Sequence, residues 1–327
     1  MYHIIVNPAS KSGKGLTIWK ILEPVFMQKG VPYRAYISSH SGHVTELVLE
    51  ITKTTTILSD CGIINLILLG GDGTVNEALQ GIRDFNRVNI GYIPTGSSND
   101  FARALKLERN PIDLLNRILN NSCVRKIDLG ILTYENALPT MSIPHDLHKP
   151  SEHARRYFIV SSGIGFDAAV CKEALSSPMK DTLNKLKLGK LTYLGIALRQ
   201  LFAAKHASCT IYPEDGKPIH IPKFLFGAFM IHPYEGGGFY FCPQADNGDG
   251  LLDLCIVGNL PKFLILFALP TAFWGKHYIF PKINHYRAAG VRIETSIPLW
   301  VHTDGEVHAK ANRIYISCSR QCVRFLA

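Results

Sequence analysis

The stretch IINLILLGGDGT, residues 63–74, decides the fold of this chain. Its first part, Ile63–Leu69, has the length and the apolar composition of a buried strand. Gly70 and Gly71 then allow the backbone to turn sharply, and a helical pattern covers Thr74–Leu79. A buried strand that passes through a glycine turn into a helix is the repeating unit of a parallel α/β sheet.

The same alternation of strand and helix extends to both sides of this stretch, over residues 1–123. It predicts a doubly wound α/β domain, with a mostly parallel sheet covered by helices on both faces. Such sheets bind ligands at the carboxyl ends of their strands, so the polar turns there are the first candidates for a site. The other expected strands are Tyr2–Val6, Tyr33–Ile37 and Ile90–Ile93, and the other expected helices are Leu16–Gln28, Val44–Lys53, Asn99–Leu105 and Ile112–Leu119.

Residues 124–327 have a different sequence pattern, in which strand-like runs separated by Gly, Pro, Asn and Asp dominate. This pattern predicts a second domain, an antiparallel β-sandwich, with one helical stretch near Leu183–Phe202. The segment Asn136–Ala154, rich in Pro and His, is expected to be an insertion, and the last residues can return to the first domain. The strands expected here are Tyr157–Val160, Phe224–Ile231, Leu252–Val257, Val291–Glu294 and Ile314–Cys318.

The composition limits which classes of partner the chain can have. It has 327 residues, 46% of them apolar, and a formal net charge of +9. The basic surplus suits nucleotide phosphates, nucleic acid or an anionic membrane surface, but no nucleic-acid-binding motif accompanies it. The eight cysteines are scattered without a CxxC pair, which favours buried free thiols over disulfides or a zinc site. No apolar run is long enough to span a bilayer, and the N-terminus does not resemble a signal peptide. We therefore expect a cytoplasmic protein whose membrane contact is peripheral.

The glycine turn after the strand at residues 63–69 is the strongest chemical signal in the sequence. Backbone N–H groups of such a turn and of the following helix form an anion site. Asp72 inside a phosphate-binding turn would repel phosphate unless a cation lay between them, so it indicates Mg²⁺. The alternative is an ordinary tight turn with a solvated Asp.

Two further polar turns follow strands of the same predicted sheet. NPASKSGKG at residues 7–15 lacks the glycine spacing of a Walker A loop but places Lys14 at the start of a helix, where a solvated basic turn is an equal alternative. PTGSSNDFAR at residues 94–103 precedes a helix that Ser98 or Asn99 is expected to cap. Because the carboxyl ends of parallel strands meet at one edge, the three turns together predict a nucleotide pocket.

In this order, the three turns and five later segments look like the diacylglycerol kinase catalytic family, which includes sphingosine, ceramide and related bacterial lipid kinases. The resemblance covers nearly the whole chain. The family usually has Asn where this chain has Val160, a Gly-Thr turn where it has Gly96-Ser97, and no counterpart of the insertion at residues 136–154. The five segments are KIDLG at 126–130, GIGFDA at 163–168, GLLD at 250–253, GKH at 275–277 and HTDGE at 302–306.

The resemblance implies an ATP-binding domain similar to that of NAD kinases and phosphofructokinases, followed by a β-sandwich that contributes to the lipid site. It implies that Asp72, Asp128 and Asp304 hold Mg²⁺ and its waters near the γ-phosphate. It also makes Glu306 the general base, although the same residues taken alone would form an ordinary hairpin turn. Glu is a weak base at its usual pKa of about 4.3, and burial beside other acids would raise that pKa. The residues implied at the ATP site are Asn7, Lys14, Gly70, Gly71, Gly73, Thr74, Thr95, Gly96, Ser98 and Asn99.

The loop at residues 246–251 is a second metal candidate. It is rich in Asp but lacks the final Glu of an EF-hand. Bacterial members of the family that resemble this chain use the equivalent loop for a structural Mg²⁺. The resemblance then assigns the carboxylate of Asp249 and the carbonyls of Asp246 and Leu251 to this ion. A metal-free Asx turn is the alternative.

The function implied is Mg²⁺-dependent transfer of the γ-phosphate of ATP to a membrane lipid hydroxyl, with diacylglycerol as the leading acceptor and phosphatidic acid as the product in phospholipid biosynthesis. A polyprenol, phosphatidylglycerol or a sphingoid base is an alternative acceptor. An NAD kinase or a catalytically silent binding module is an alternative to the whole interpretation. Members that resemble this chain are often homodimers.

Two amphipathic stretches are candidates for contact with the inner face of an anionic membrane, although core helices have the same pattern. They are Phe263–Phe280, flanked by Lys262, Lys276 and Lys282, and Leu183–Phe202. The histidines, among them His145, His148 and His153, show no ligand spacing and are interpreted as surface residues.

Overall fold

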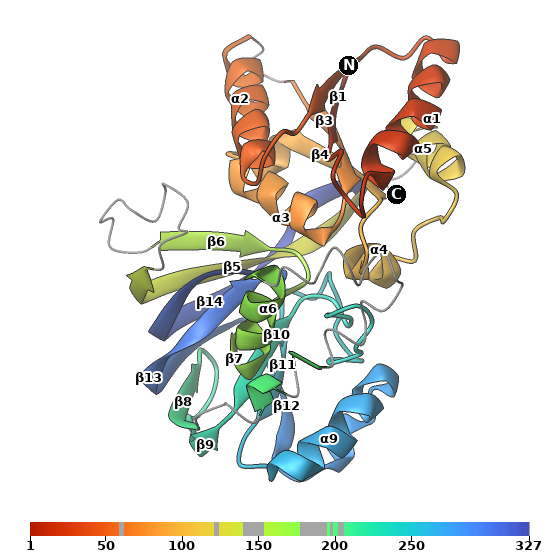
Figure 1. The fold of residues 1–327 in the computed structure, drawn as a ribbon. Helices are drawn as coiled ribbons and strands as arrows, with labels where there is room; N and C mark the ends of the chain where they lie inside the picture. Colours follow the sequence, from red (N-terminus) through yellow and green to blue (C-terminus); the bar gives the residue numbers. More distant parts are fainter. Residues whose placement is uncertain are drawn as a thin grey trace. The chain divides into compact units, whose positions relative to one another are not determined.

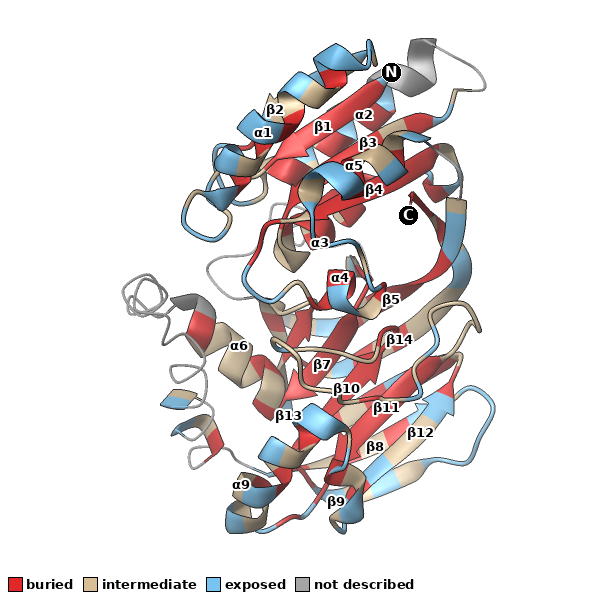
Figure 2. Ribbon diagram, turned by 90° about the vertical axis from the view of Figure 1, so that its right-hand side faces the viewer, coloured by how far each residue is buried: buried red, intermediate tan, exposed pale blue. Residues whose placement is uncertain are grey.

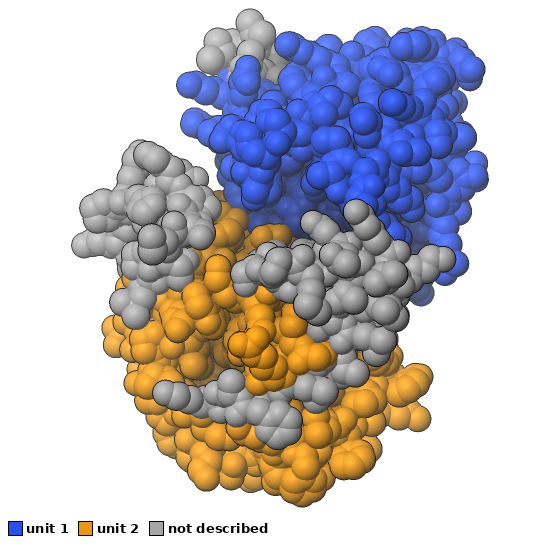
Figure 3. Space-filling view, viewed as in Figure 1, with its two compact units in different colours: residues 1–129, 247–249, 319–327 blue, residues 130–246, 250–318 orange. Residues whose placement is uncertain are grey.

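The computed structural model describes residues 1–58, 62–120, 124–139, 154–176, 195–196, 199–201 and 206–326. It divides into two compact units (Figure 3). Unit 1 comprises residues 1–129, 247–249 and 319–327, and unit 2 comprises residues 130–246 and 250–318. Two strands pass from one unit to the other: β5 (Val124–Pro139) begins in unit 1, and β14 (Glu306–Leu326) ends there.

Unit 1 contains a parallel sheet with the strand order β2-β1-β3-β4-β14. Most of its strand residues are buried, which explains why these strands appear in the sequence as continuous apolar runs. The first four strands are β1 (Tyr2–Val6), β2 (Tyr33–Ile37), β3 (Ile64–Gly70) and β4 (Val88–Pro94).

Helices cover both faces of this sheet (Figure 1). On one face, α1 (Lys14–Gln28) and α5 (Pro111–Asn120) bury Trp19, Leu22 and Leu115 in a core with β1, β3 and β4. On the other face, α2 (His43–Leu58) packs against α3 (Asp72–Gly81), and the Thr45 hydroxyl donates to the carbonyl of Glu77. Two short helices, η1 (Phe85–Arg87) and α4 (Asp100–Ala104), flank β4.

Unit 2 is built from antiparallel strands, in the path β12-β11-β10-β7-β13-β14. In addition, β8 pairs with β13 and β9, and β5 pairs with β6. These pairings form the predicted β-sandwich. The strands are β6 (Ala154–Phe158), β7 (Ser161–Gly165), β8 (Ala207–Pro213), β9 (Ile219–Phe224), β10 (Phe226–Met230), β11 (Leu252–Val257), β12 (Ile283–Ala288) and β13 (Gly290–Thr303).

The central strands of unit 2 are buried on both sides, as the red strands of Figure 2 show. Along β10, Phe229 points into the sandwich core, whereas Ala228 and Met230 point into a second core. This second core also contains residues of α6 (Phe166–Ser176) and α9 (Lys262–Thr271). Two short helices, η3 (Ala272–Trp274) and η4 (His277–Ile279), follow α9.

Most predicted elements of unit 1 are found within one or two residues of their expected ends, although α2 continues five residues beyond the expected Lys53. In unit 2, β13 and β14 extend well beyond the short strands expected at 291–294 and 314–318, and the strand expected at 157–160 is the end of β6. Three further differences are informative. The apolar run Phe224–Ile231 was expected to be one strand but is split at Leu225, where β9 ends and β10 begins. β5 continues to Pro139, into the segment expected to be an insertion, whose residues 140–153 lie outside the described ranges. The helix expected near 183–202 also falls largely outside them.

Two expectations from composition can be compared with the described residues. Six described cysteines form no disulfide; Cys209, Cys242 and Cys255 are buried as expected, whereas the three at positions 171, 318 and 322 are partly exposed. No helix in the described ranges combines the length and the apolarity needed to cross a bilayer.

Candidate active site

The three polar turns at the carboxyl edge of the unit 1 sheet are joined by direct hydrogen bonds. The Asn7 side-chain amide donates to the Thr74 hydroxyl at 3.0 Å, and the Ser10 and Thr95 hydroxyls lie 2.7 Å apart. The Thr95 N–H also donates to the carbonyl of Gly70 at 2.7 Å. Sequence order separates these turns, but the parallel sheet brings them together as predicted.

The glycines of these turns are required by close backbone contact. A Cβ atom on Gly96 would lie 2.5 Å from the Cα of Gly71, and one on Gly70 would lie 2.2 Å from the Thr74 hydroxyl oxygen. Real Cβ atoms do not approach other atoms so closely, so side chains are excluded at both positions. The two turns therefore present bare backbone, which is the surface that phosphate oxygens approach most closely.

The turn before α1 has an unusual backbone. Lys11, Ser12 and Gly13 have φ angles of 45°, 56° and 97°, and the left-handed region costs a non-glycine residue about 1–2 kcal/mol. Strain of this kind is concentrated at ligand-binding sites, where successive N–H groups can form an anion-binding concavity. Lys14, which is exposed, lines a small pocket together with Arg109, a second cation that the sequence analysis did not single out.

Asp72 has a structural role that the sequence did not reveal. Its carboxylate accepts hydrogen bonds from the N–H groups of Asp100 at 2.9 Å and Phe101 at 3.3 Å, and so caps the start of α4. The cap expected from Ser98 or Asn99 is absent, because Asn99 makes no side-chain capping bond and instead donates to the carbonyl of Gly96. The carboxylate oxygens of Asp72 are of the kind that Mg²⁺ prefers as ligands.

Asp128 joins three segments of unit 1. This fully buried residue accepts the Gln321 N–H at 2.6 Å, and its own N–H donates to the carbonyl of Asn247 at 2.7 Å. The Gln321 side chain donates to the carbonyl of Gly248. The loop predicted to hold a structural Mg²⁺ is therefore attached to Asp128 at residues 247–249. Of the ligands predicted for that ion, Asp249 lies in unit 1, whereas Asp246 and Leu251 lie in unit 2.

Asp304 occupies a two-residue hairpin turn between β13 and β14 in unit 2. Asp304 and Gly305 have φ angles of 50° and 85°, as a type I′ turn requires. The Asp304 carboxylate accepts three backbone N–H groups, from Ile159 at 3.1 Å, Val160 at 2.8 Å and Ser161 at 3.0 Å. This clamp fixes the turn, and with it the start of β14 at the half-buried Glu306, which pairs with Thr303.

A buried group of three polar side chains supports the same turn. His302, which is fully buried, has its Nε2 atom 3.2 Å from Asp167 Oδ2 and 3.1 Å from Glu235 Oε1. The Gly305 N–H donates to His302 Nδ1 at 3.2 Å, which needs the lone pair of that nitrogen. In the neutral ring the proton is therefore on Nε2, between the two carboxylates. Burial lowers the pKa of His302, but the charge of Glu235 and the hydrogen bond to Asp167 outweigh it and raise the pKa well above its usual value.

The motif glycine at position 163 makes room for this group. A Cβ atom on Gly163 would lie 1.9 Å from Asp167 Oδ2 and 2.4 Å from His302 Nε2. Burial raises the pKa of Asp167, which the hydrogen bond from His302 partly offsets, and burial raises the pKa of the neighbouring Cys171 to about 12. The motifs that contain Asp167 and His302 could be located in the sequence, but the contact of His302 with Asp167 and Glu235 could not be foreseen, because both carboxylates are far from His302 along the chain.

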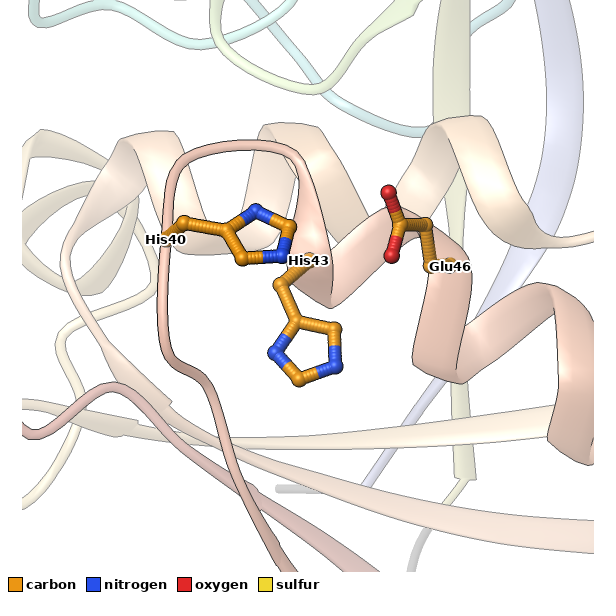
Figure 4. A group of neighbouring side chains, drawn as sticks. All are labelled: His40, His43 and Glu46. Carbon is orange, nitrogen blue, oxygen red and sulfur yellow. The ribbon is translucent and has the colours of Figure 1, made fainter.

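A second cluster of possible metal ligands lies after β2, at the same edge of the sheet as the polar turns (Figure 4). His40, His43 and Glu46 have ligand atoms within 4.8 Å of one another, and the two imidazole rings are stacked. These two histidines therefore depart from the expectation that no histidine has ligand spacing. His43 Nδ1 accepts the Ser39 N–H, and His40 and Glu46 are exposed, so we assign no ion to them.

The residues present fit the groups that the sequence predicts. Bare glycine backbone, hydroxyls and the side-chain amide of Asn7 lie together at the three turns, and Asp72 and Asp128 carry carboxylate oxygens, the kind of ligand that Mg²⁺ prefers. Of the other residues predicted at the ATP site, Gly73 lies in the first turn of α3, and Ser98 is exposed just before α4. Asp304 and Glu306 belong to unit 2.

Comparison with known proteins agrees with these motifs. The diacylglycerol kinase catalytic domain matches residues 1–132, and the YegS C-terminal NAD kinase beta sandwich-like domain matches residues 159–326. A Bacillus subtilis protein named "Putative lipid kinase YtlR" is 27% identical over 316 residues, 94% of this chain and 93% of that protein. The Bacillus subtilis diacylglycerol kinase is 28% identical over 313 residues, 93% of this chain and 88% of the relative.

A solved structure shows the same fold. The crystal structure of a diacylglycerol kinase from Bacillus anthracis superposes with a TM-score of 0.68 at 21% identity, covering 99% of this chain and 96% of that one. The two family models together match most of the chain, and the second alone matches half of it. The chain therefore belongs to the diacylglycerol kinase family, and it is a lipid kinase.

Proposed function

We propose that the protein transfers the γ-phosphate of ATP to the free hydroxyl of diacylglycerol, with Mg²⁺, and produces phosphatidic acid. The packing of the Gly70-Gly71 and Gly96 turns beside Asp72 is the observation that carries the nucleotide part of this proposal. The acceptor is supported by relatives named diacylglycerol kinase that match along most of their length.

The chemistry assigned to each residue follows from what phosphoryl transfer requires. The reaction depends on in-line positioning and on neutralisation of charge, with little covalent work for the protein. The N–H groups of the glycine turns and the Lys14 ammonium would bind the phosphates. Asp72 and Asp128 would hold Mg²⁺, which when bound neutralises charge on the phosphate oxygens.

The proton of the lipid hydroxyl must be removed as that oxygen attacks. The hydroxyl oxygen forms a bond to the γ-phosphorus, the bond from this phosphorus to the bridging oxygen of ADP breaks, and the proton passes to the Glu306 carboxylate. The three N–H bonds to Asp304 and the His302–Gly305 contact hold the turn that precedes this carboxylate. A structural Mg²⁺ at Asp246, Asp249 and Leu251, a homodimer, and a peripheral position at the inner face of the membrane are parts of the same proposal.

A panel of acceptors tests the proposal. Transfer of labelled phosphate from ATP would be measured to diacylglycerol, a polyprenol, phosphatidylglycerol, a sphingoid base and NAD, each with Mg²⁺ and after its removal by chelation. We expect labelling of diacylglycerol that disappears on chelation and returns with added Mg²⁺. Labelling of another lipid alone would replace the acceptor. Labelling of NAD alone, or of nothing while ATP still binds, would contradict the proposal.

A further inference from the structure

Unit 2 has an exposed apolar surface on α9 and the two short helices after it. We call this the apolar patch, and the blue stretches of α9 in Figure 2 show part of it. Large apolar side chains are normally among the more buried ones, so five exposed ones within a short segment need an explanation. Its residues and exposed fractions are Phe263 59%, Phe267 66%, Phe273 42%, Trp274 69% and Ile279 76%.

The patch is the outer side of an element whose inner side is firmly packed. Ile265 and Ala268 of α9 lie in the second core of unit 2, together with residues of β10 and β11. Phe263 and Phe267 are one helical turn apart and so project from the same outer side. The helix is therefore apolar on both sides, and only one of them is covered within the described part of the chain.

The charged side chains of the segment that carries the patch are all basic. No Asp or Glu occurs between Asp253 and Glu294. Lys276 and Lys282 are exposed beside the patch. Lys262 begins α9 and, with Lys223, lies near enough to His206 that both lysines lower its pKa, after the larger effect of burial. Exposed aromatic side chains among lysines, in a segment without acidic residues, are the composition of segments that lie on anionic membranes.

The patch is continuous with a row of aromatic rings that leads into unit 2. The Phe273 ring stacks on Phe239 with centroids 4.1 Å apart, and Phe239 stacks on Phe241 at 5.6 Å. Phe239 pairs through its backbone with Glu235, which contacts His302. The same short hairpin therefore contacts the patch at one end and, at the other, the histidine that accepts the Gly305 N–H.

We propose that the apolar patch is the surface through which unit 2 lies on an anionic phospholipid bilayer. In this arrangement Phe263, Phe267 and Trp274 insert among the headgroups, where aromatic side chains are favoured, and the lysines face the lipid phosphates. The inference rests on the proposed function, because a kinase acting on a membrane lipid must reach the bilayer. A second copy of the chain fits less well, because a two-fold contact would bring the same lysines together without an acidic partner.

Vesicle flotation tests the proposal with the full-length chain. The double variant Phe267→Ser/Trp274→Ser would be compared with the wild type on vesicles of phosphatidylcholine alone and of phosphatidylcholine with phosphatidylglycerol. Met27→Ser is the matched control, since Met27 in unit 1 is exposed to 65%, close to the 66% of Phe267. We expect the double variant to bind anionic vesicles at least about tenfold more weakly, equivalent to about 1.4 kcal/mol, and the control to bind like the wild type.

Two companion measurements separate the contribution of the lysine charges to vesicle binding from that of Trp274. Lys276→Glu/Lys282→Glu should weaken binding to the anionic vesicles in low salt and have a smaller effect in high salt, where exposed charges are screened. Trp274→Phe should remove most of the blue shift in tryptophan fluorescence that the anionic vesicles cause. Of the other two tryptophans, Trp19 is buried, and Trp300 is half-buried on β13, where Lys172 and Lys310 lie over its ring. Thermal unfolding of every variant should match that of the wild type, since all the substituted side chains are exposed.

The outcomes distinguish a failure of the membrane-binding proposal from a failure of the proposed kinase function. If the wild type phosphorylates diacylglycerol, the double variant should keep its rate on a short-chain, water-soluble diacylglycerol and lose it on vesicles. If the wild type phosphorylates no diacylglycerol, the proposed function fails, and flotation alone still decides the patch. Unchanged flotation of the double variant would overturn the inference. So would a change from dimer to monomer in sedimentation with vesicle binding intact, because the patch would then be a subunit interface.

Discussion

Substitution of Asp72 separates the two roles assigned to its carboxylate. In the structure it accepts the N–H groups of Asp100 and Phe101 and so caps α4, and in the proposed function it also holds Mg²⁺. Asp72→Ala removes both roles. Asp72→Asn keeps one neutral oxygen that can accept an N–H, but loses the charge that attracts a metal.

The magnitudes follow from these two bonds. Hydrogen bonds to charged groups contribute about 1.5–3 kcal/mol each when buried, and a helix cap contributes about 1 kcal/mol. Because Asp72 is only half-buried, we expect Asp72→Ala to destabilise the protein by about 2–3 kcal/mol and Asp72→Asn by about 1 kcal/mol. Both should lower kcat by about 100-fold or more, since each removes a charge placed for the transition state.

Thermal unfolding and labelled-phosphate transfer, measured on the same preparations, check these values. Asp84→Ala is the control, because Asp84 also caps a helix of unit 1, η1, with its carboxylate accepting the Asn86 N–H at 2.9 Å. It should lose about 1 kcal/mol of stability and keep its activity. An Asp72→Asn enzyme that is less stable but fully active would refute the metal role and leave Asp72 as a cap alone.

Three further predictions concern other parts of the site and core. Gly96→Ala places a Cβ 2.5 Å from the Cα of Gly71, so calorimetry should show ATP binding weakened at least tenfold, and wild-type affinity would contradict the packing of the turns. His302→Asn retains an acceptor for the Gly305 N–H, whereas His302→Leu does not. The kcat should therefore fall much further in the Leu variant, with the KM for ATP unchanged in both, and equal kcat values would refute the role of this contact. Burial lowers the pKa of His277 to about 4, whereas the unfolded value is about 6.5. The free energy of unfolding measured in urea should therefore be constant above pH 6.5 with respect to this group and fall by about 2–3 kcal/mol as the pH falls from 6.5 toward 4. His277→Gln should reduce this pH dependence, and an unchanged profile would count against it.

Much of the fold could be predicted because its signals are local. The strands Tyr2–Val6, Tyr33–Ile37 and Leu252–Val257 have the predicted ends, since polar or glycine residues mark where each apolar run stops. The split at Leu225 could not be predicted, because an apolar residue at the corner looks like any other residue of a strand. What changes there is which strands pair, and pairing depends on distant parts of the chain.

Some features of the candidate site could likewise be predicted from local sequence, and others could not. The three polar turns could be located because each directly follows a strand, and the parallel sheet places all strand ends at one edge. The capping of α4 by Asp72 could not be foreseen, because the helix that it caps begins after the next strand. The contact of His302 with Asp167 and Glu235 was missed for a similar reason, since those residues belong to distant elements of unit 2.

Phosphate transfer to diacylglycerol by the wild type and by Glu306→Gln is the most direct test of the central claim. Glutamine keeps the size of the side chain and cannot accept the proton, so the comparison isolates the general base. We predict labelled phosphatidic acid from the wild type and a kcat about 100-fold or more lower from the variant, with ATP binding unchanged. Equal rates from both proteins would contradict the role of Glu306, and no product from the wild type would contradict diacylglycerol as the acceptor.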